Sequence, residues 1–178
     1  AIAAYAEKTD PGYIIFATKD GKYVKHVEVG ALPDMVTFTP NGKKAIVANE
    51  GEPNKDTTID PKGSISVIDV ATLTATTLNF TETMLDEKVR TSYKGASIIE
   101  QLEPEYVTVS PDSKTAWVTL QENNAIAKIN ITTKTATDIF PLGFKDYNTD
   151  ANAMDLSDKD GVVYGPKKYK VKGMYMPD

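Results

Sequence analysis

Short runs of β-branched and aromatic residues alternate along the chain with clusters of Pro, Asn, Asp, Gly and Ser. The run at 33–38 is followed by the turn sequence Thr-Pro-Asn-Gly at 39–42, and a second run begins at 43. Pro suits the φ angle of such a turn, and the Asn after it can bond nearby backbone groups through its short side chain. This pattern predicts a β-hairpin.

The same hairpin pattern occurs twice. The stretch at 33–48 recurs at 104–119, with Ser-Pro-Asp-Ser in the second turn. Each copy is followed by a further pair of strand-like runs, at 63–78 and at 124–139. Four antiparallel strands repeated in series are typical of β-propeller blades. We therefore predict an all-β fold, a segment of a β-propeller built from four-stranded antiparallel blades.

The repeat also divides the chain. Propellers close with about four to eight blades, so about two full blades plus parts of two others indicate a segment of a longer protein. We expect short helical turns at 81–90 and 96–102, where the two full blades are joined. The predicted parts are the end of a preceding blade at 1–30, a blade at 31–80 with a long loop insert at 49–62, an interblade connection at 81–103, a blade at 104–140, a long insertion at 141–172, and the start of the next blade at 173–178.

One rim of this fold is predicted to carry the long loops. In a four-stranded blade, the loops between the second and third strands leave the same rim as the connections between blades. Asp34, Glu105 and Asp178 occupy the same repeat position at the start of an innermost strand, so we expect them around one mouth of the central channel. The inserts at 49–62 and 141–172 leave from this rim, and the opposite rim carries tight turns. Long loops on one face indicate a functional face.

The amino-acid composition argues against several classes of partner and site. The net charge is −5 and the pI is about 5.0, with basic residues scattered over turns and strand edges, so nucleic acid is not expected as a partner. The chain has no cysteine, which excludes thiol catalysis and Cys-ligated metals within it. No apolar run is long enough to span a bilayer. We expect the single histidine, His26, on the surface or between blades, and the single tryptophan, Trp117, in the core.

The insertion at 141–172 contains a candidate cation-binding turn. Asp155, Asp158 and Asp160 lie within six positions, next to Gly161, as in oxygen-ligated calcium loops. An EF-hand is excluded, because Leu156 occupies the first ligand position and no Glu follows six residues after the glycine. The alternative is an ordinary solvated acidic turn.

Other carboxylates are predicted to reach the same rim. Like charges on one rim repel one another unless they are solvated or neutralised by a cation. Oxygen ligands with no cysteine and one histidine favour calcium or magnesium over zinc or copper, and we expect calcium. The candidate metal ligands are Asp155, Asp158, Asp160, Glu50, Glu52, Asp34 and Glu105.

Several long phrases resemble one known family. They are LPDMVTFTPNGKKAIVANEGEP, LEPEYVTVSPDSKTAWVTLQENNAIAKI, PLGFKDY, DLSDKDG and VKGMYMPD. The chain is similar over nearly its whole length to the choice-of-anchor I family of surface propeller proteins, which includes mesenchyme-specific cell-surface glycoproteins. The resemblance implies an extracellular or cell-surface β-propeller held by varied C-terminal anchors, and it implies no particular reaction.

These observations favour a non-catalytic binding module with a divalent cation on its elaborated rim. A surface protein or a polysaccharide is the expected partner, next to the remaining blades of the same longer protein. Two alternatives stay open: a metal-dependent, phosphoesterase-like hydrolase that uses carboxylates on the same rim, and a structural surface scaffold.

Overall fold

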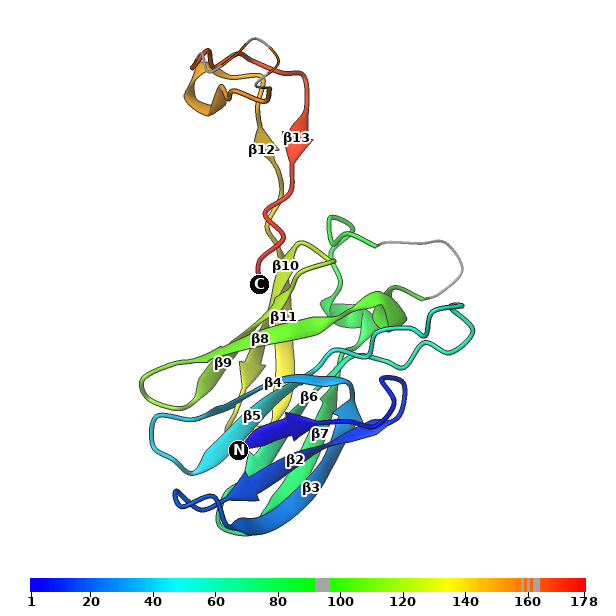
Figure 1. The fold of residues 1–178 in the computed structure, drawn as a ribbon, viewed down its shortest axis with the longest axis vertical. Helices are drawn as coiled ribbons and strands as arrows, with labels where there is room; N and C mark the ends of the chain where they lie inside the picture. The colour runs from blue at the N-terminus through cyan, green and yellow to red at the C-terminus, as the bar shows by residue number, and fades with distance from the viewer. Residues whose placement is uncertain (92–96, 158, 160, 162–163) are drawn as a thin grey trace. The chain divides into compact units, whose positions relative to one another are not determined.

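The computed structural model describes residues 1–91, 97–157, 159, 161 and 164–178 (Figure 1). The chain forms two compact units, one made of residues 1–141 with 176–178 and the other of residues 142–175.

The first unit begins with a three-stranded antiparallel sheet in the order β1-β2-β3. Its strands are β1 (Ile2–Ala4), β2 (Pro11–Ala17) and β3 (Tyr23–Ala31). Residues alternate between the two faces of a strand, and β2 follows this rule: Ile14 and Phe16 are buried while Tyr13 is exposed. One face of this sheet is therefore packed into the core.

Two four-stranded antiparallel sheets follow, as the repeat predicts. The first has the order β4-β5-β6-β7, and the second has the order β11-β10-β9-β8, so each is a simple meander (Figure 1). The bounds are β4 (Pro33–Phe38), β5 (Lys44–Asn49), β6 (Ser64–Asp69), β7 (Thr74–Asn79), β8 (Pro104–Val109), β9 (Thr115–Leu120), β10 (Ala125–Asn130) and β11 (Thr135–Pro141).

The two hairpin turns have the same geometry. Thr39 N–H donates to the Lys44 carbonyl at 2.9 Å, and Ser110 N–H donates to the Thr115 carbonyl at the same distance. The fourth turn residue is left-handed in both copies, with φ of 68° at Gly42 and 62° at Ser113. Glycine adopts this conformation without strain and serine does not. Ser113 keeps it because its buried hydroxyl accepts a hydrogen bond from Asn41 N–H of the other turn at 3.1 Å.

The core consists of two apolar layers between neighbouring sheets. Ile14, Phe16 and Val27 of the first sheet pack with Val47 and Ile68 of the second. The opposite face of the second sheet packs against the third. This larger layer includes Ile46, Val67, Val118, Leu120 and Ile129, all fully buried. Burying apolar surface stabilises the folded state by about 25 cal/mol per Å². This is the main force that holds the sheets together.

Trp117 departs from the prediction. It stands at the repeat position of Ile46, yet 38% of its surface is exposed, whereas Ile46 is fully buried. The face of β9 that carries Ala116 and Val118 points into the core, so Trp117 lies on the other face, with no sheet packed against it among the described residues. The prediction that Trp117 belongs to the core is therefore wrong.

The connection between the two four-stranded sheets contains two 3₁₀ turns, η1 (Glu82–Met84) and η2 (Ile98–Gln101). The short helical turns predicted there are present, although residues 92–96 lie outside the described part of the chain. η2 begins with a capping box, in which the Ser97 side chain accepts from Glu100 N–H and the Glu100 carboxylate accepts from Ser97 N–H.

The second unit, residues 142–175, contains β12 (Lys145–Asp146) paired with β13 (Lys172–Gly173) and the 3₁₀ turn η3 (Asp150–Asn152). Met154 and Lys167 add an isolated antiparallel bridge. In the described part of the chain, no helix has both the length and the apolar character needed to cross a membrane.

Candidate acidic site at the strand-start rim

Two of the predicted acidic residues lie at the start of an innermost strand. Asp34 is the second residue of β4, and Glu105 is the second residue of β8. The strand register shifts beside each of them, between Pro33 and Met35 and between Pro104 and Val107. Such an irregularity redirects a side chain that would otherwise follow the pleat. Equivalent positions in the repeat thus place two carboxylates at the same rim.

The insert at 49–62 begins and ends at a tightly closed base. Glu50 N–H donates to the Leu32 carbonyl at 2.8 Å. Gly51 has φ of 73°, and a Cβ on it would lie 2.5 Å from Gly63 N. A Cβ on Gly63 would collide with the Leu102 carbonyl. Because neither glycine has a side chain, the backbone at 50–51, at 61–63 and at 102–104 can approach closely. This close approach brings Glu50 near the chain just before β8.

Asn123 holds the other side of the rim. Its side chain is 1% exposed and donates to the Gln101 carbonyl at 2.6 Å and to the Arg90 carbonyl at 3.0 Å. Its Oδ1 accepts from Glu103 N–H at 3.2 Å. Arg90 in turn donates from Nη1 to the Glu122 carbonyl at 2.6 Å. Arg90 is therefore a half-buried residue that joins this loop to the connection between the two sheets.

Glu50 and Glu103 interact electrostatically at this rim. Burial raises the pKa of Glu50 to about 7, and the nearby carboxylates of Glu52, Asp34 and Glu122 raise it further, against the opposing effect of Lys8. Burial likewise raises the pKa of Glu103 to about 7, with Glu122 and Glu50 as the nearest charges that add to the effect. Both side chains therefore hold a proton far more readily than an exposed glutamate does.

Glu105 is the most perturbed carboxyl. Burial raises its pKa to about 8, followed by the charge of Glu122 and a side-chain hydrogen bond with it, and then by Glu50 and Asp178. The carboxyl of Glu122 is thus the neighbour that most raises the pKa of Glu105. Asp34, which is more exposed, has its pKa raised by partial burial and by Asp178.

One oxygen at this rim has no donor. Glu122 Oε2 is shielded from solvent and accepts no hydrogen bond from the described residues. A buried carboxylate oxygen is costly unless a proton, a donor or a cation meets it. We use the name acidic rim below for Asp34, Glu50, Glu52, Glu103, Glu105, Glu122 and Asp178.

The sequence-predicted residues separate into two groups. Asp34, Glu50, Glu52 and Glu105 interact electrostatically at the acidic rim, where Glu52 also pairs with Lys8 at 2.9 Å. The remaining three belong to the second unit. Asp155 Oδ2 accepts from Gly165 N–H at 3.0 Å. Asp158 and Asp160 lie outside the described residues. A metal-binding role for these three remains a prediction.

Glu103 and Glu122 were missed as site residues. Glu103 has no acidic counterpart in the first repeat, where Leu32 stands at its position, so the repeat gives no signal for it. Glu122 lies in the loop between β9 and β10, which was expected at this rim. Its neighbour Asn123 is the usable signal, since a short loop that ends in two asparagines has side chains that can bond backbone groups.

The acidic rim is not a preformed metal cage. Within residues that the structure describes, no three His, Cys, Asp or Glu side chains converge in a way that would hold a metal ion. The raised pKa values of Glu50, Glu103 and Glu105 instead favour the uptake of protons at this rim near neutral pH.

Comparison with known proteins agrees with this architecture. The choice-of-anchor I domain model matches residues 1–178. Comparison with curated proteins found no match. Among solved structures, hydrazine synthase from Kuenenia stuttgartiensis aligns over 77% of this chain and 34% of its own, with 19% identity and a TM-score of 0.51. The β-propeller domain of the Trilobed protease from Pyrococcus furiosus aligns over 76% of this chain and 36% of its own, with 13% identity and a TM-score of 0.46.

At such low identity the likeness to these structures concerns the fold alone. The chain spans about a third of the length of each of them. The sheets are blades of a β-propeller, and the predicted all-β fold of four-stranded antiparallel blades is confirmed.

Proposed function

The chain belongs to the choice-of-anchor I domain family, and from that premise we propose that it is part of a non-catalytic cell-surface propeller whose acidic rim binds a divalent cation. The cation is calcium, and it prepares the rim for a surface protein or a polysaccharide. The observation that carries the proposal is the shielded Glu122 Oε2, which accepts no hydrogen bond from the described residues, together with Glu105, whose pKa is raised by burial and by the neighbouring Glu122.

A cation can neutralise the carboxylates of this rim, as a proton can. Two adjacent carboxylates repel each other when both are ionised, and either a proton or a metal ion removes the repulsion. Glu50 lies near enough to affect both Glu105 and Glu103 and supplies further oxygens. Metal binding competes with protons because carboxylate ligands must be ionised. The affinity therefore rises with pH through the pKa values of about 7 to about 8.

Calcium suits this rim better than magnesium does. Calcium accepts about six to eight oxygens in flexible geometry, whereas magnesium demands a near-ideal octahedron. Long glutamate side chains that are not arranged as a cage can turn toward a calcium ion, with water completing its coordination. Peptide carbonyls at the closed base of the 49–62 insert, such as the Glu50 carbonyl beside Gly63, are further available oxygens.

The test is thermal unfolding of the purified protein with calcium and with chelator at about pH 8. A ligand at about 100 times its Kd stabilises the folded state by about 2.7 kcal/mol, which corresponds to about 5–10 °C for a chain of this size. Glu105→Gln combined with Glu122→Gln is expected to remove the shift.

Two further variants test where on the chain the calcium ion binds. Asp138→Asn changes an exposed carboxylate on β11 that pairs with Lys128 at 3.9 Å, and it is expected to keep the calcium shift. A triple variant tests the predicted acidic turn of the second unit; it combines Asp155→Asn, Asp158→Asn and Asp160→Asn. If calcium shifts nothing, or if only this triple variant removes the shift, the acidic rim is not the cation site.

A further inference from the structure

The opposite rim of the same strands carries a cluster of lysines. Lys43 and Lys44 follow the turn between β4 and β5, Lys114 ends the turn between β8 and β9, and Lys134 ends the turn between β10 and β11. These turns enclose a cavity of about 340 Å³ lined by all four lysines, with Asp112 and Ile131 among the other lining residues. A second cavity of about 380 Å³ shares Lys43 and Lys44 and extends to Asp69. We call this pair of adjoining hollows the lysine groove.

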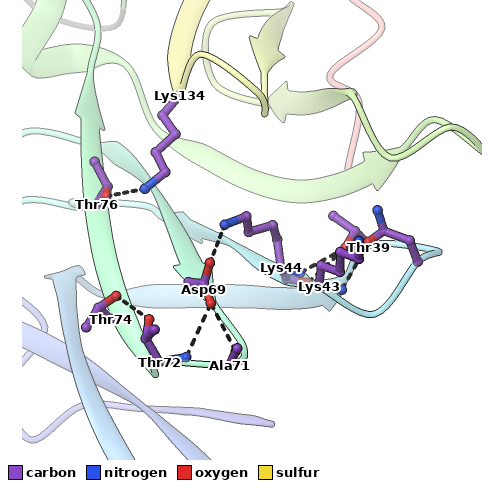
Figure 2. A network of polar contacts seen from close by, with 10 residues as sticks. Thr39, Lys43, Lys44, Asp69, Ala71, Thr72, Thr74, Thr76 and Lys134 are labelled. Carbon is purple, nitrogen blue, oxygen red and sulfur yellow. Dashed lines mark hydrogen bonds and ion pairs between the residues drawn. The ribbon is translucent and has the colours of Figure 1, made fainter.

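Polar contacts within the second sheet and between it and the third hold the lysine groove in place. Lys134 Nζ reaches across to Thr76 Oγ1 of the preceding sheet at 2.9 Å, and Lys44 Nζ pairs with Asp69 Oδ2 at 2.5 Å (Figure 2). The two hairpin turns are joined by the bond from Asn41 N–H to Ser113 Oγ. An ammonium group has three donors, so each of these two lysines keeps donors for a ligand after making its described contact.

The internal repeat shows whether the charged side chains of these turns are needed for the turns to fold. Asp69 and Asn130 hold equivalent positions: Asp69 Oδ1 accepts from two backbone N–H groups at 3.0 and 3.2 Å, and Asn130 Oδ1 accepts from two at 3.0 Å. Leu73 and Lys134 are likewise equivalent, with φ of 52° and 54°. Both turns therefore fold alike although the second has lost an acid and gained a base. The added positive charge is not required by the fold.

The resulting charge is local and opposes that of the whole chain. The four lysines of the groove face two carboxylates, those of Asp69 and Asp112, whereas the chain has a net charge of −5. Lys43 and Lys114 are exposed. A cleft lined by one sign of charge raises the local concentration of ions of the opposite sign.

We propose that the lysine groove binds a polymer that carries tetrahedral oxyanions, phosphate or sulfate. Lysine binds such anions as a point charge. A single exposed charge contact is weak, so a ligand that contacts both adjoining hollows at once is needed for useful affinity, and an extended polyanion meets this need. No aromatic or arginine side chain is among the described residues that line the groove, so nucleobases have nothing on which to stack.

Binding can be measured with linear polyphosphate and with dextran sulfate, using the purified protein at low salt. Both are expected to bind with an affinity that falls as salt rises. Lys114→Gln combined with Lys134→Gln is expected to weaken binding about tenfold while the melting temperature stays near that of the wild type. The matched control is Lys55→Gln combined with Lys88→Gln, two exposed lysines in the 49–62 insert and the 81–103 connection with the same change in charge.

Each possible result either supports or overturns the proposal. Selective loss in the groove variant supports the proposal, and the better of the two polymers identifies phosphate or sulfate as the preferred oxyanion. Equal loss in the control variant, or no binding of either polymer, overturns it. Equally tight binding of polyglutamate overturns the tetrahedral preference, and tighter binding of single-stranded oligothymidylate assigns the groove to nucleic acid instead. Glu105→Gln with Glu122→Gln, the variant that tests the acidic rim, is expected to retain polyphosphate binding, so the two proposals fail separately.

Discussion

Burial and the neighbouring carboxylate of Glu122 raise the pKa of Glu105 at the acidic rim. Glu50 and Glu103 add two more groups whose pKa is raised mainly by burial. Glu50, Glu103 and Glu105 therefore make the rim sensitive to pH in the neutral range, a property that isolated surface glutamates do not have.

The sign of the pH effect follows from these shifts. The pKa values of Glu50, Glu103 and Glu105 rise from 4.5 in the unfolded chain to about 7, about 7 and about 8 in the folded chain. Between these limits the folded state binds more protons, so the free energy of unfolding falls as pH rises. Without divalent cations, we expect the melting temperature to be about 3–6 °C lower at about pH 8 than at about pH 5.5, after allowance for solvent screening.

The variant Glu105→Gln tests this cause. It removes the ionisation that is penalised at high pH, so it is expected to flatten the pH profile and to raise the melting temperature at about pH 8. Melting curves from about pH 5 to pH 8 measure both effects. A variant profile parallel to that of the wild type would assign the pH dependence to other groups.

Asn123 is a second single residue with a large predicted effect. Asn123→Ala removes three hydrogen bonds and leaves the buried carbonyls of Gln101 and Arg90 without this donor. The expected cost is about 2–4 kcal/mol in the free energy of unfolding, measured by denaturant titration. Asn148→Ala, at an exposed position of the second unit, is the control and is expected to cost less than about 0.5 kcal/mol.

Among the elements, the 49–62 insert depends on its closed base. Gly63→Ala places a methyl group against the Leu102 carbonyl and the ring of Pro104. We expect this change to separate the base of the insert from the start of β8, to destabilise the chain by about 2–4 kcal/mol and to weaken calcium binding at the acidic rim. Gly42→Ala is the comparison, because a Cβ there meets no atom within 4 Å and only the left-handed backbone opposes it. Calorimetry with and without calcium distinguishes the two variants.

The strands and turns were predictable from the sequence because they depend on local patterns. The Thr-Pro-Asn-Gly and Ser-Pro-Asp-Ser turns mark the hairpins, and the repeat shows that the four-stranded sheet occurs twice. The acidic rim was predictable only in part. Asp34 and Glu105 share a repeat position, but Glu103 and Glu122 reach the rim through one connection and one loop that Asn123 holds together. Such long-range contacts leave no periodic pattern in the sequence.

At the scale of the molecule, the outer face of the third sheet carries three large exposed apolar side chains, next to polar ones such as Lys128 and Asp138. Tyr106, Trp117 and Phe140 are 52%, 38% and 47% exposed. Large exposed apolar patches favour association. We expect residues 1–178, made by themselves, to associate in solution at micromolar concentration, as measured by analytical ultracentrifugation. Trp117→Lys combined with Phe140→Lys is expected to shift the distribution toward monomer, and a wild-type chain that remains monomeric would contradict the prediction.

The position of Trp117 also has a practical consequence. It is the single tryptophan of the chain, and its half-exposed ring lies on the outer face of β9 rather than between sheets. Its fluorescence therefore reports on the solvent at that one face. Any blade, second copy or partner that covers the face will move the emission to shorter wavelength, whereas a cation at the acidic rim or a polyanion in the lysine groove will leave it nearly unchanged. Trp117 fluorescence can therefore be used to detect contacts at this face without an added label.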